Sequence, residues 1–230
     1  MKLIEKIKLF FRNYQIYLIM LFGILMGILI TSHLSISIYK SYTNNHKEEL
    51  YSPLYVQNCM YTLKYNAAKN DLVNEVDNYI KSVAPQSSLE GYVIMEECLE
   101  NSIDICFVLA QGENESHFGT TGLARKTNSV FNVYAFDGLG HNEISNQGKY
   151  KHPNYSVKPY IELLKSDYLV NGKTEYDLMD GEYVNKNGAR YASSETYEKS
   201  LLNKYTKIRQ YTKIDSLCQE VNKYKLFLGI

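Results

Sequence analysis

The most constraining feature of the sequence is a short run that is apolar on nearly every side, Ser102 to Ala110 (SIDICFVLA). A helix that is hydrophobic all round must be buried inside a domain. Ser102 is a suitable N-cap residue, because its hydroxyl can accept a hydrogen bond from a free N–H group of the first helical turn. We therefore predict a central helix that begins near residue 102 and is covered by the rest of the domain.

This helix changes character at its far end. A polar run from Gln111 to His117 follows the apolar run and precedes Gly119, a residue type that commonly ends helices. The negative end of the helix dipole and the apolar walls nearby both disfavour a charged carboxylate at this place. We expect a raised pKa at Glu115, which is what a general acid needs. Glu113, two residues earlier, is expected to point to another face and to be exposed.

Two motifs follow one another along this part of the chain. The first runs from Ala110 to Thr120 as A-Q-x-x-x-E-S-x-x-G-T and continues with Leu123, Ala124, Asn128 and Phe131. The second is the stretch from Gly188 to Leu201 (GARYASSETYEKSL). In this order they resemble the glucosaminidase domains of glycoside hydrolase family 73, which are lysozyme-like peptidoglycan hydrolases and include bacterial autolysins. The resemblance covers roughly residues 77–208.

The resemblance implies an endo-β-N-acetylglucosaminidase that cleaves the β-1,4 bond after N-acetylglucosamine without a cofactor. It makes Glu115 the catalytic acid and places Tyr191 at the far wall of the sugar cleft. The alternative for Tyr191 is a tyrosine that only packs in the core. The matched positions also give candidate substrate-binding residues, which are Gln111, Ser116, Asn128 and Phe131. Asn128 and Phe131 would shape the sugar cleft, and buried packing is the alternative for Phe131.

The motifs leave the second catalytic group open. Many relatives carry a second acidic residue on a longer β-hairpin lobe after the Asn/Phe motif, whereas only about 25 residues separate Phe131 from Ser156 here. Asp137 and Glu143 are the acids in that gap. Either one acts in an inverting mechanism, or the acetamido oxygen of the substrate takes the place of the second carboxylate.

The N-terminal part of the chain predicts a membrane anchor. No Asp, Glu, Lys or Arg occurs from Asn13 to Tyr39, and the apolar core of this run is close to the roughly 20 residues that cross a bilayer. The basic residues ahead of it outnumber the single acid, so the positive-inside rule places the N-terminus in the cytoplasm and the catalytic domain outside. A cleaved signal peptide, whose apolar region is usually shorter, and a buried core helix are the alternatives.

These observations divide the chain into four parts. They are a basic cytoplasmic tail (1–12), a transmembrane anchor (13–39), a juxtamembrane tether (40–53) and a glucosaminidase-like catalytic domain (54–230). The expected fold class is mainly α, a lysozyme-like helical domain with a short irregular or β lobe. The partners that this organisation implies are the peptidoglycan glycan strand and, through the N-terminal helix, the inner membrane.

Apolar spacing and capping residues place the other helices of the domain. We expect one broken helix or two over 54–83, a helix from Ser87 or Ser88 to about Leu99, and a helix over 156–168. Short helices are expected over 121–126 and 174–179, and a long helix that includes Leu201 and Leu202 is expected to start at Ser193 or Ser194. The tail to residue 230 is helix-like, and residues 130–136 form the one brief β-like run.

Composition argues against several other classes of function. The 25 basic and 25 acidic residues cancel, so charge gives no hint of nucleic-acid binding. No His or Cys spacing of a metal site occurs, and we expect no metal. Trp is absent and Tyr is abundant, so a sugar would stack on Tyr or Phe. The four cysteines are compatible with free buried thiols or with a bridge between Cys98 and Cys106.

Three functions stay open at this point. The first is the anchored glucosaminidase. The second is a muramidase or lytic transglycosylase on the same fold, of which the lyase needs a single acid and adds no water to its product. The third is a non-enzymatic protein that binds or assembles cell-wall glycan.

Overall fold

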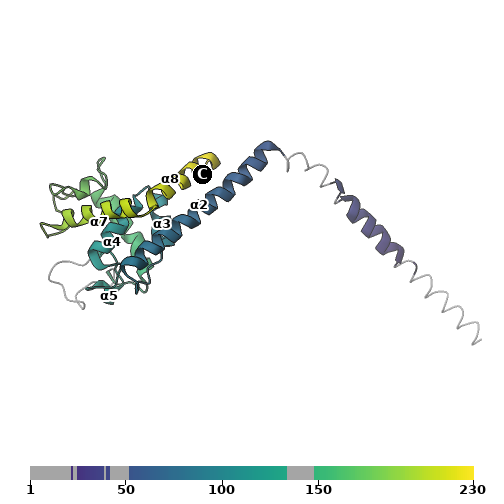
Figure 1. The fold of residues 1–230 in the computed structure, drawn as a ribbon. Coiled ribbons are helices and arrows are strands. Elements are labelled where there is room, and N and C mark those ends of the chain that lie inside the picture. Colours follow the sequence, from purple (N-terminus) through teal and green to yellow (C-terminus); the bar gives the residue numbers. More distant parts are fainter. Residues whose placement is uncertain (1–21, 23–24, 39, 42–51, 134–147) are drawn as a thin grey trace, which may run out of the picture. The chain divides into compact units, whose positions relative to one another are not determined.

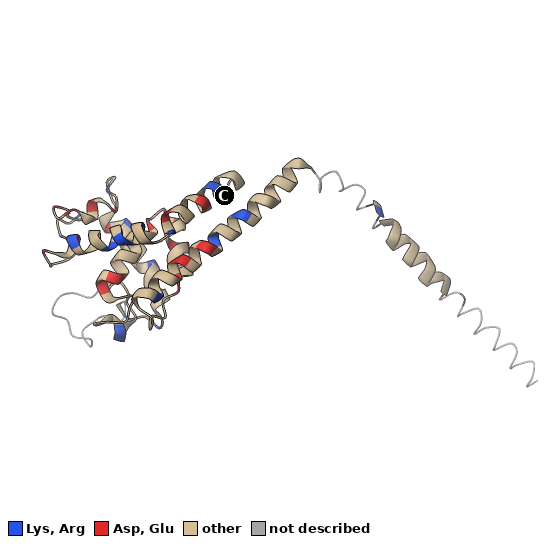
Figure 2. Cartoon of the chain, viewed as in Figure 1, with Lys and Arg blue, Asp and Glu red and all other residues tan. Residues whose placement is uncertain are grey.

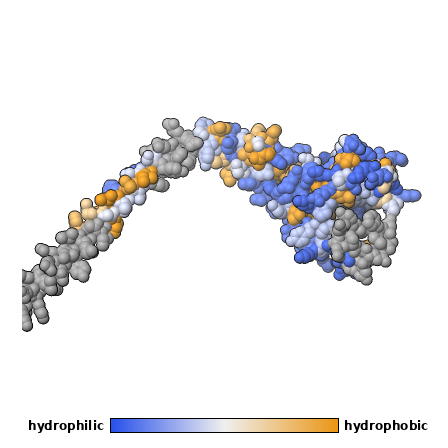
Figure 3. All heavy atoms as spheres, turned by 180° about the vertical axis from the view of Figure 1, so that it is seen from behind, coloured by the Kyte–Doolittle hydropathy of each residue, from blue (hydrophilic) through white to orange (hydrophobic). Residues whose placement is uncertain are grey.

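The computed structural model describes residues 22, 25–38, 40, 41, 52–133 and 148–230. The chain divides into two compact units, 1–60 and 61–230. In the first unit residues 25–38 are helical, and their apolar side chains are exposed (Figure 3). None of the helices in the described ranges is both long enough and apolar enough to cross a bilayer.

The described part of the chain is mainly helical and has no strand (Figure 1). Its longer helices are α2 (Pro53–Val83), α3 (Gly91–Asn101), α4 (Ile105–Ser116), α6 (Val157–Leu163), α7 (Tyr197–Tyr211) and α8 (Ile214–Leu228). The shorter ones are α5 (Ala124–Thr127), the 3-10 helices η2 (Pro153–Ser156) and η4 (Asp177–Met179), and the π-helical turn η3 (Leu164–Tyr168). The predicted mainly α class is confirmed.

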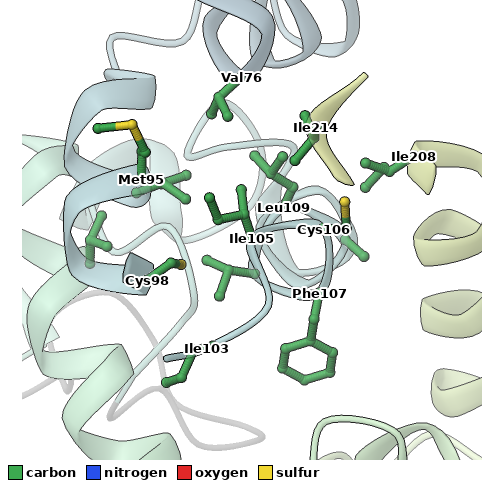
Figure 4. Close-up of a cluster of buried hydrophobic side chains, with 14 of the residues drawn as sticks. Val76, Met95, Cys98, Ile103, Ile105, Cys106, Phe107, Leu109, Ile208 and Ile214 are labelled. Carbon is green, nitrogen blue, oxygen red and sulfur yellow. The ribbon is translucent and has the colours of Figure 1, made fainter. Parts of the chain in front are cut away.

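Helix α4 is the central helix of the second unit, as its composition predicts. Helices α3, α7 and α8 pack against it, and every residue from Ile105 to Gly112 is buried. Figure 4 shows side chains of α2, α3, α7 and α8 meeting those of α4 in one cluster, which includes Val76, Met95, Cys106, Leu109, Ile208 and Ile214. The core of the domain is therefore built around this helix.

The start of α4 differs from the prediction. Asp104, and not Ser102, is the N-cap, and its carboxylate accepts hydrogen bonds from the N–H groups of Cys106 at 2.7 Å and Phe107 at 3.3 Å. Ser102 ends α3 instead, with a left-handed backbone (φ 56°) that turns the chain toward α4. Cys98 and Cys106 are free buried thiols, which decides against the bridge between them.

Helices α2 and α3 also correct the predicted boundaries. Helix α2 is continuous, and its buried residues repeat every four positions, at Ala68, Leu72, Val76 and Ile80. Helix α3 begins at Gly91 rather than at Ser87 or Ser88. The close approach of α2 explains this start, because a Cβ atom at Gly91 would lie 2.8 Å from the Asp77 nitrogen, and Asp77 accepts a hydrogen bond from the Gly91 N–H at 2.6 Å. Ser87 lies buried and donates to the Phe118 carbonyl at 2.7 Å.

The remaining elements follow the predicted spans with shifted ends. The span 156–168 divides into α6 and η3, and Val157, Tyr160, Ile161 and Leu164 are all buried, as predicted. The N-cap position of α7 is Thr196 rather than Ser193 or Ser194, and the predicted helix-like tail is α8. Residues 130–133 form a turn instead of the expected β-like run, of which the rest lies outside the described residues.

The surface of the second unit carries charges of both signs. In Figure 2, Lys and Arg are interspersed with Asp and Glu along the helices. Several of these charges form pairs between helices, such as Lys69 with Glu96 and Lys204 with Glu113. In the view of Figure 3 the unit is mainly hydrophilic, with scattered apolar residues.

Two neighbouring leucines of α7 test how specifically this helix packs on the core. Leu201 is 0% exposed, whereas Leu202 is 44% exposed. We expect Leu201→Ala to lower the free energy of unfolding by about 2–5 kcal/mol, because it leaves a cavity. Leu202→Ala, the matched control, should change it by less than about 0.5 kcal/mol. Chemical denaturation measures both, and equal losses would contradict the packing described.

Candidate active site

The end of α4 brings Glu115 to the border between core and solvent. The helix ends at Ser116, and His117 and Phe118 take left-handed backbone conformations (φ 47° and 53°), so that the chain turns before Gly119 is reached. Gly112 makes room for this turn, because a Cβ atom there would lie 3.1 Å from the Phe118 ring. The Glu115 side chain is thereby left half-buried in the last helical turn.

Both oxygens of the Glu115 carboxylate accept hydrogen bonds from neutral donors. The Tyr197 hydroxyl donates to Oε1 at 2.6 Å, and the Asn132 amide Nδ2 donates to Oε2 at 3.2 Å. Asn132 also donates to the Glu115 carbonyl at 3.1 Å and has a left-handed backbone (φ 51°). The carboxylate is therefore held at two points, by the first residue of α7 and by the segment after α5.

Burial raises the pKa of Glu115, and this effect outweighs the hydrogen bonds from Tyr197 and Asn132, which lower it. The direction is the one predicted from the sequence. The physical cause is loss of solvent, which disfavours the charged form, whereas neither partner carries a positive charge that would favour it. A carboxyl group in this setting keeps its proton to a higher pH than an exposed glutamate does.

Gln111 and Phe131 lie behind Glu115 in the interior. Gln111 is 0% exposed, accepts a hydrogen bond on Oε1 from the Tyr160 hydroxyl, and donates from Nε2 to the Tyr197 hydroxyl at 3.2 Å. Phe131 is buried, and its ring stacks on that of Tyr160 with centroids 3.8 Å apart. In this conformation the two predicted substrate-binding residues support the groups that hold Glu115.

Ser116 and Asn128 fix the segment that follows the helix. Ser116 is buried, donates to the Val130 carbonyl at 2.6 Å and accepts from the Gly119 N–H at 2.8 Å. Asn128 ends α5 with a left-handed backbone (φ 56°), and its amide donates to the Tyr150 carbonyl at 2.8 Å. Their hydrogen bonds hold the chain on which Phe131 and Asn132 follow.

Tyr191 lies beside the group that holds Glu115. Its ring stacks on Tyr197 with centroids 5.5 Å apart, and the ring of Tyr168 of η3 is tilted against it with centroids 5.0 Å apart. Tyr191 is half-buried, and burial raises the pKa of its hydroxyl well above the ordinary range. Tyr191 and Tyr168 are therefore neutral aromatic groups close to the acid.

Glu113 is not exposed, contrary to the prediction. Its side chain is 15% exposed, and its carboxylate pairs with Lys204 of α7 at 2.9 Å. The Tyr79 hydroxyl of α2 donates to the other oxygen. The prediction was wrong because α2 and α7 cover this side of α4 as well. The cationic partner distinguishes Glu113 from Glu115.

Asp137 and Glu143 lie outside the described residues, so the structure does not place the predicted second acid. A different acidic cluster occurs at the other end of α4, where ligand atoms of Asp104, Cys106 and Asp215 lie within 4.8 Å of one another. Its carboxylates already have partners, because Asp104 caps α4 and Asp215 pairs with Arg209. Burial also raises the pKa of the Cys106 thiol, which disfavours the thiolate that binds metals.

Sequence reasoning missed the two direct partners of Glu115, Tyr197 and Asn132. A signal for Tyr197 was present, because it is the second tyrosine of the stretch from Gly188 to Leu201. Asn132 follows Phe131 directly but lies beyond the last matched motif position. No protein-family model matches the chain, and no curated protein is significantly similar to it.

The raised pKa of Glu115 predicts how stability depends on pH. Between the ordinary value of 4.5 and its higher value in the fold, the folded chain binds a proton that the unfolded chain has lost. Stability therefore falls as pH rises through this window, by about 1.4 kcal/mol for each unit that separates the two values. Glu115→Gln removes the effect. The free energy of unfolding of this variant should therefore rise relative to that of the wild type as the pH increases from 4 to 8. A difference that stays constant with pH would contradict the burial of Glu115.

Proposed function

We propose that this chain is a peptidoglycan hydrolase with a lysozyme-like helical domain, in which Glu115 is the general acid of an endo-β-N-acetylglucosaminidase. One observation carries the proposal, namely a half-buried carboxyl group with a raised pKa at the end of the central helix. This residue is also the acid of the motif that resembles glycoside hydrolase family 73. Both lines of reasoning support the same side chain.

The proposed reaction begins with protonated Glu115. The carboxyl group donates its proton to the glycosidic oxygen of the β-1,4 bond as the bond breaks, and the sugar develops oxocarbenium character. Asp137, Glu143 or the substrate's acetamido oxygen then stabilises that charge. In this reaction Tyr191, which stacks on Tyr197, would hydrogen-bond the sugar or the acetamido group.

A second candidate is a lytic transglycosylase or muramidase on the same fold. It uses the same carboxyl group, whose hydrogen-bond partners in the described residues are a phenol and an amide. A lyase needs only one group that acts first as acid and then as base. Its product carries an anhydro sugar, whereas hydrolysis adds water.

We also propose that residues 13–39 anchor the chain in the inner membrane, with the N-terminus in the cytoplasm and the catalytic domain in the periplasm or cell wall. The uncharged run and the basic residues ahead of it support this orientation. Residues 1–12 would then form a cytoplasmic tail, and residues 40–53 would tether the domain to its anchor.

Digestion of purified peptidoglycan by the full chain tests the activity. We expect the wild type to release muropeptides with reducible N-acetylglucosamine ends. Glu115→Gln should lower the rate by about 10²- to 10⁴-fold, which is the usual contribution of a general acid. Glu113→Gln is the matched control on the same helix and should keep most of the activity. Mass spectrometry of the reduced products measures all three.

The products separate the candidates. Reducible N-acetylmuramic acid ends or anhydro products would replace the glucosaminidase by the second candidate. Absence of release from every wall type would favour a non-enzymatic glycan-binding protein. An equal loss of activity in Glu115→Gln and Glu113→Gln would contradict the specific role of Glu115 as the general acid.

Membrane attachment is tested by fractionating bacteria that express the full chain. We expect the chain to stay in the membrane pellet after carbonate washing, because an apolar segment of this length does not dissociate with peripheral proteins. Protease added outside spheroplasts should digest the domain while a cytoplasmic control protein survives. Recovery of the chain in the wash, or protection of the domain, would contradict the proposed anchor or its orientation.

A further inference from the structure

The hydrogen bonds behind Glu115 all run in one direction. Tyr160 donates to Gln111 Oε1, so the amide nitrogen Nε2 of Gln111 is turned toward Tyr197. Nε2 donates to the Tyr197 oxygen at 3.2 Å, and the Tyr197 hydroxyl donates to Glu115 Oε1 at 2.6 Å. Because the Gln111 oxygen and nitrogen are both engaged, reversing any one bond leaves a neighbouring donor without an acceptor.

Packing holds each member of this chain of bonds in place. Phe131 stacks on Tyr160, and Tyr191 stacks on Tyr197. Gln111 is fully buried in the middle, where water cannot take the place of a lost partner. A buried polar network of this kind is stable only when every member is satisfied. The direction of the bonds is therefore a fixed property of the fold.

We propose that Tyr197, oriented by Gln111, is a positioning residue that determines which oxygen of Glu115 carries the transferable proton. Oε1 accepts the Tyr197 proton, so the proton of neutral Glu115 sits on Oε2, which the Asn132 amide approaches at a longer 3.2 Å. After the proton has left, the same Tyr197 bond stabilises the carboxylate. This inference rests on the proposed role of Glu115 as the acid.

The titratable groups whose pKa is affected by the charge of Glu115 include four phenols. They are Tyr160 of α6, Tyr168 of η3, Tyr191 of the segment before α7, and Tyr197 of α7. Burial raises the pKa of each hydroxyl, so all four stay neutral while Glu115 titrates. A change in the Glu115 titration on altering Tyr197 therefore reports the hydrogen bond and not the loss of a charge.

The test is a direct titration of Glu115 in the full chain. Glutamate labelled with ¹³C at the side-chain carboxyl is followed by NMR against pH, and the Glu115 signal is the one that Glu115→Gln removes. Tyr197→Phe keeps the ring and its stacking but removes the donor. We expect it to raise the pKa of Glu115 by roughly one unit, a tenfold change in proton affinity.

Tyr205→Phe is the matched control for this substitution. Tyr205 is a buried tyrosine of α7 whose hydroxyl donates to a different carboxylate, that of Asp104, at 2.8 Å. It loses the same atom from the same helix and should leave the Glu115 titration unchanged. An equal response of Glu115 to both substitutions, or no response to Tyr197→Phe, would overturn the inference.

A second variant covers the case in which Tyr197→Phe does not fold. Replacing Tyr197 by 3-fluorotyrosine preserves the shape and the hydroxyl while making the phenol a stronger donor. The pKa of Glu115 should then fall, opposite to the effect of phenylalanine. An unchanged or raised value would contradict the coupling between these two residues.

The titration needs no substrate, so it separates this inference from the proposed function. If the chain cleaves no glycan but substitution of Tyr197 still changes the pKa of Glu115, the proposed enzymatic function is wrong and the inferred effect of Tyr197 on Glu115 stands. Where glycan is cleaved, the alkaline limb of the kcat/KM profile should move to higher pH in Tyr197→Phe and not in Tyr205→Phe. If the alkaline limb of Tyr197→Phe stays at the wild-type pH, Tyr197 does not position the catalytic proton.

Discussion

The burial of α4 is the constraint on which the rest of the domain depends. A helix without a solvent face exists only if other helices cover all of it, and here α3, α7 and α8 pack directly against it. The same burial fixes the chemistry at the end of the helix. Glu115 lies three positions after a run of eight buried residues, so its side chain has little water around it, and its pKa rises for that reason.

The central helix could be predicted because its composition is a property of the segment itself. The helix starts were less predictable, because several residues near each start are equally good caps. Ser102 and Asp104 both suit an N-cap, but Asp104 also accepts a hydrogen bond from Tyr205 of α7, a contact that local sequence does not contain. In the same way α3 starts at Gly91 because α2 approaches it closely, and not at the serines that precede it.

Glu115 could be predicted because it is the acid of the motif and also lies where the helix sequence changes from apolar to polar residues. Its partners come from segments far apart in the chain, since Tyr197 is 82 positions away and Asn132 is 17 positions away. Such contacts require the tertiary fold. The motif residues Gln111 and Phe131 show the same limit, because the resemblance names them as candidate substrate-binding residues but does not indicate that both side chains are buried behind Glu115.

Glu113 and Glu115 show how one helix end gives two carboxylates different properties. The helix dipole acts on both, so the difference must come from their partners. Glu113 has the cationic Lys204 as its partner, whereas Glu115 has the neutral Tyr197 and Asn132.

Lys204 and Tyr197 lie seven positions apart on α7, which is two helical turns, and therefore share one face. Between them Ser200 donates to Asn114 at 2.7 Å. One face of α7 thus supplies a charge to one glutamate and a neutral donor to the other. Carboxyl groups that differ in this way are suited to different roles, one as a structural ion pair and one as a proton donor.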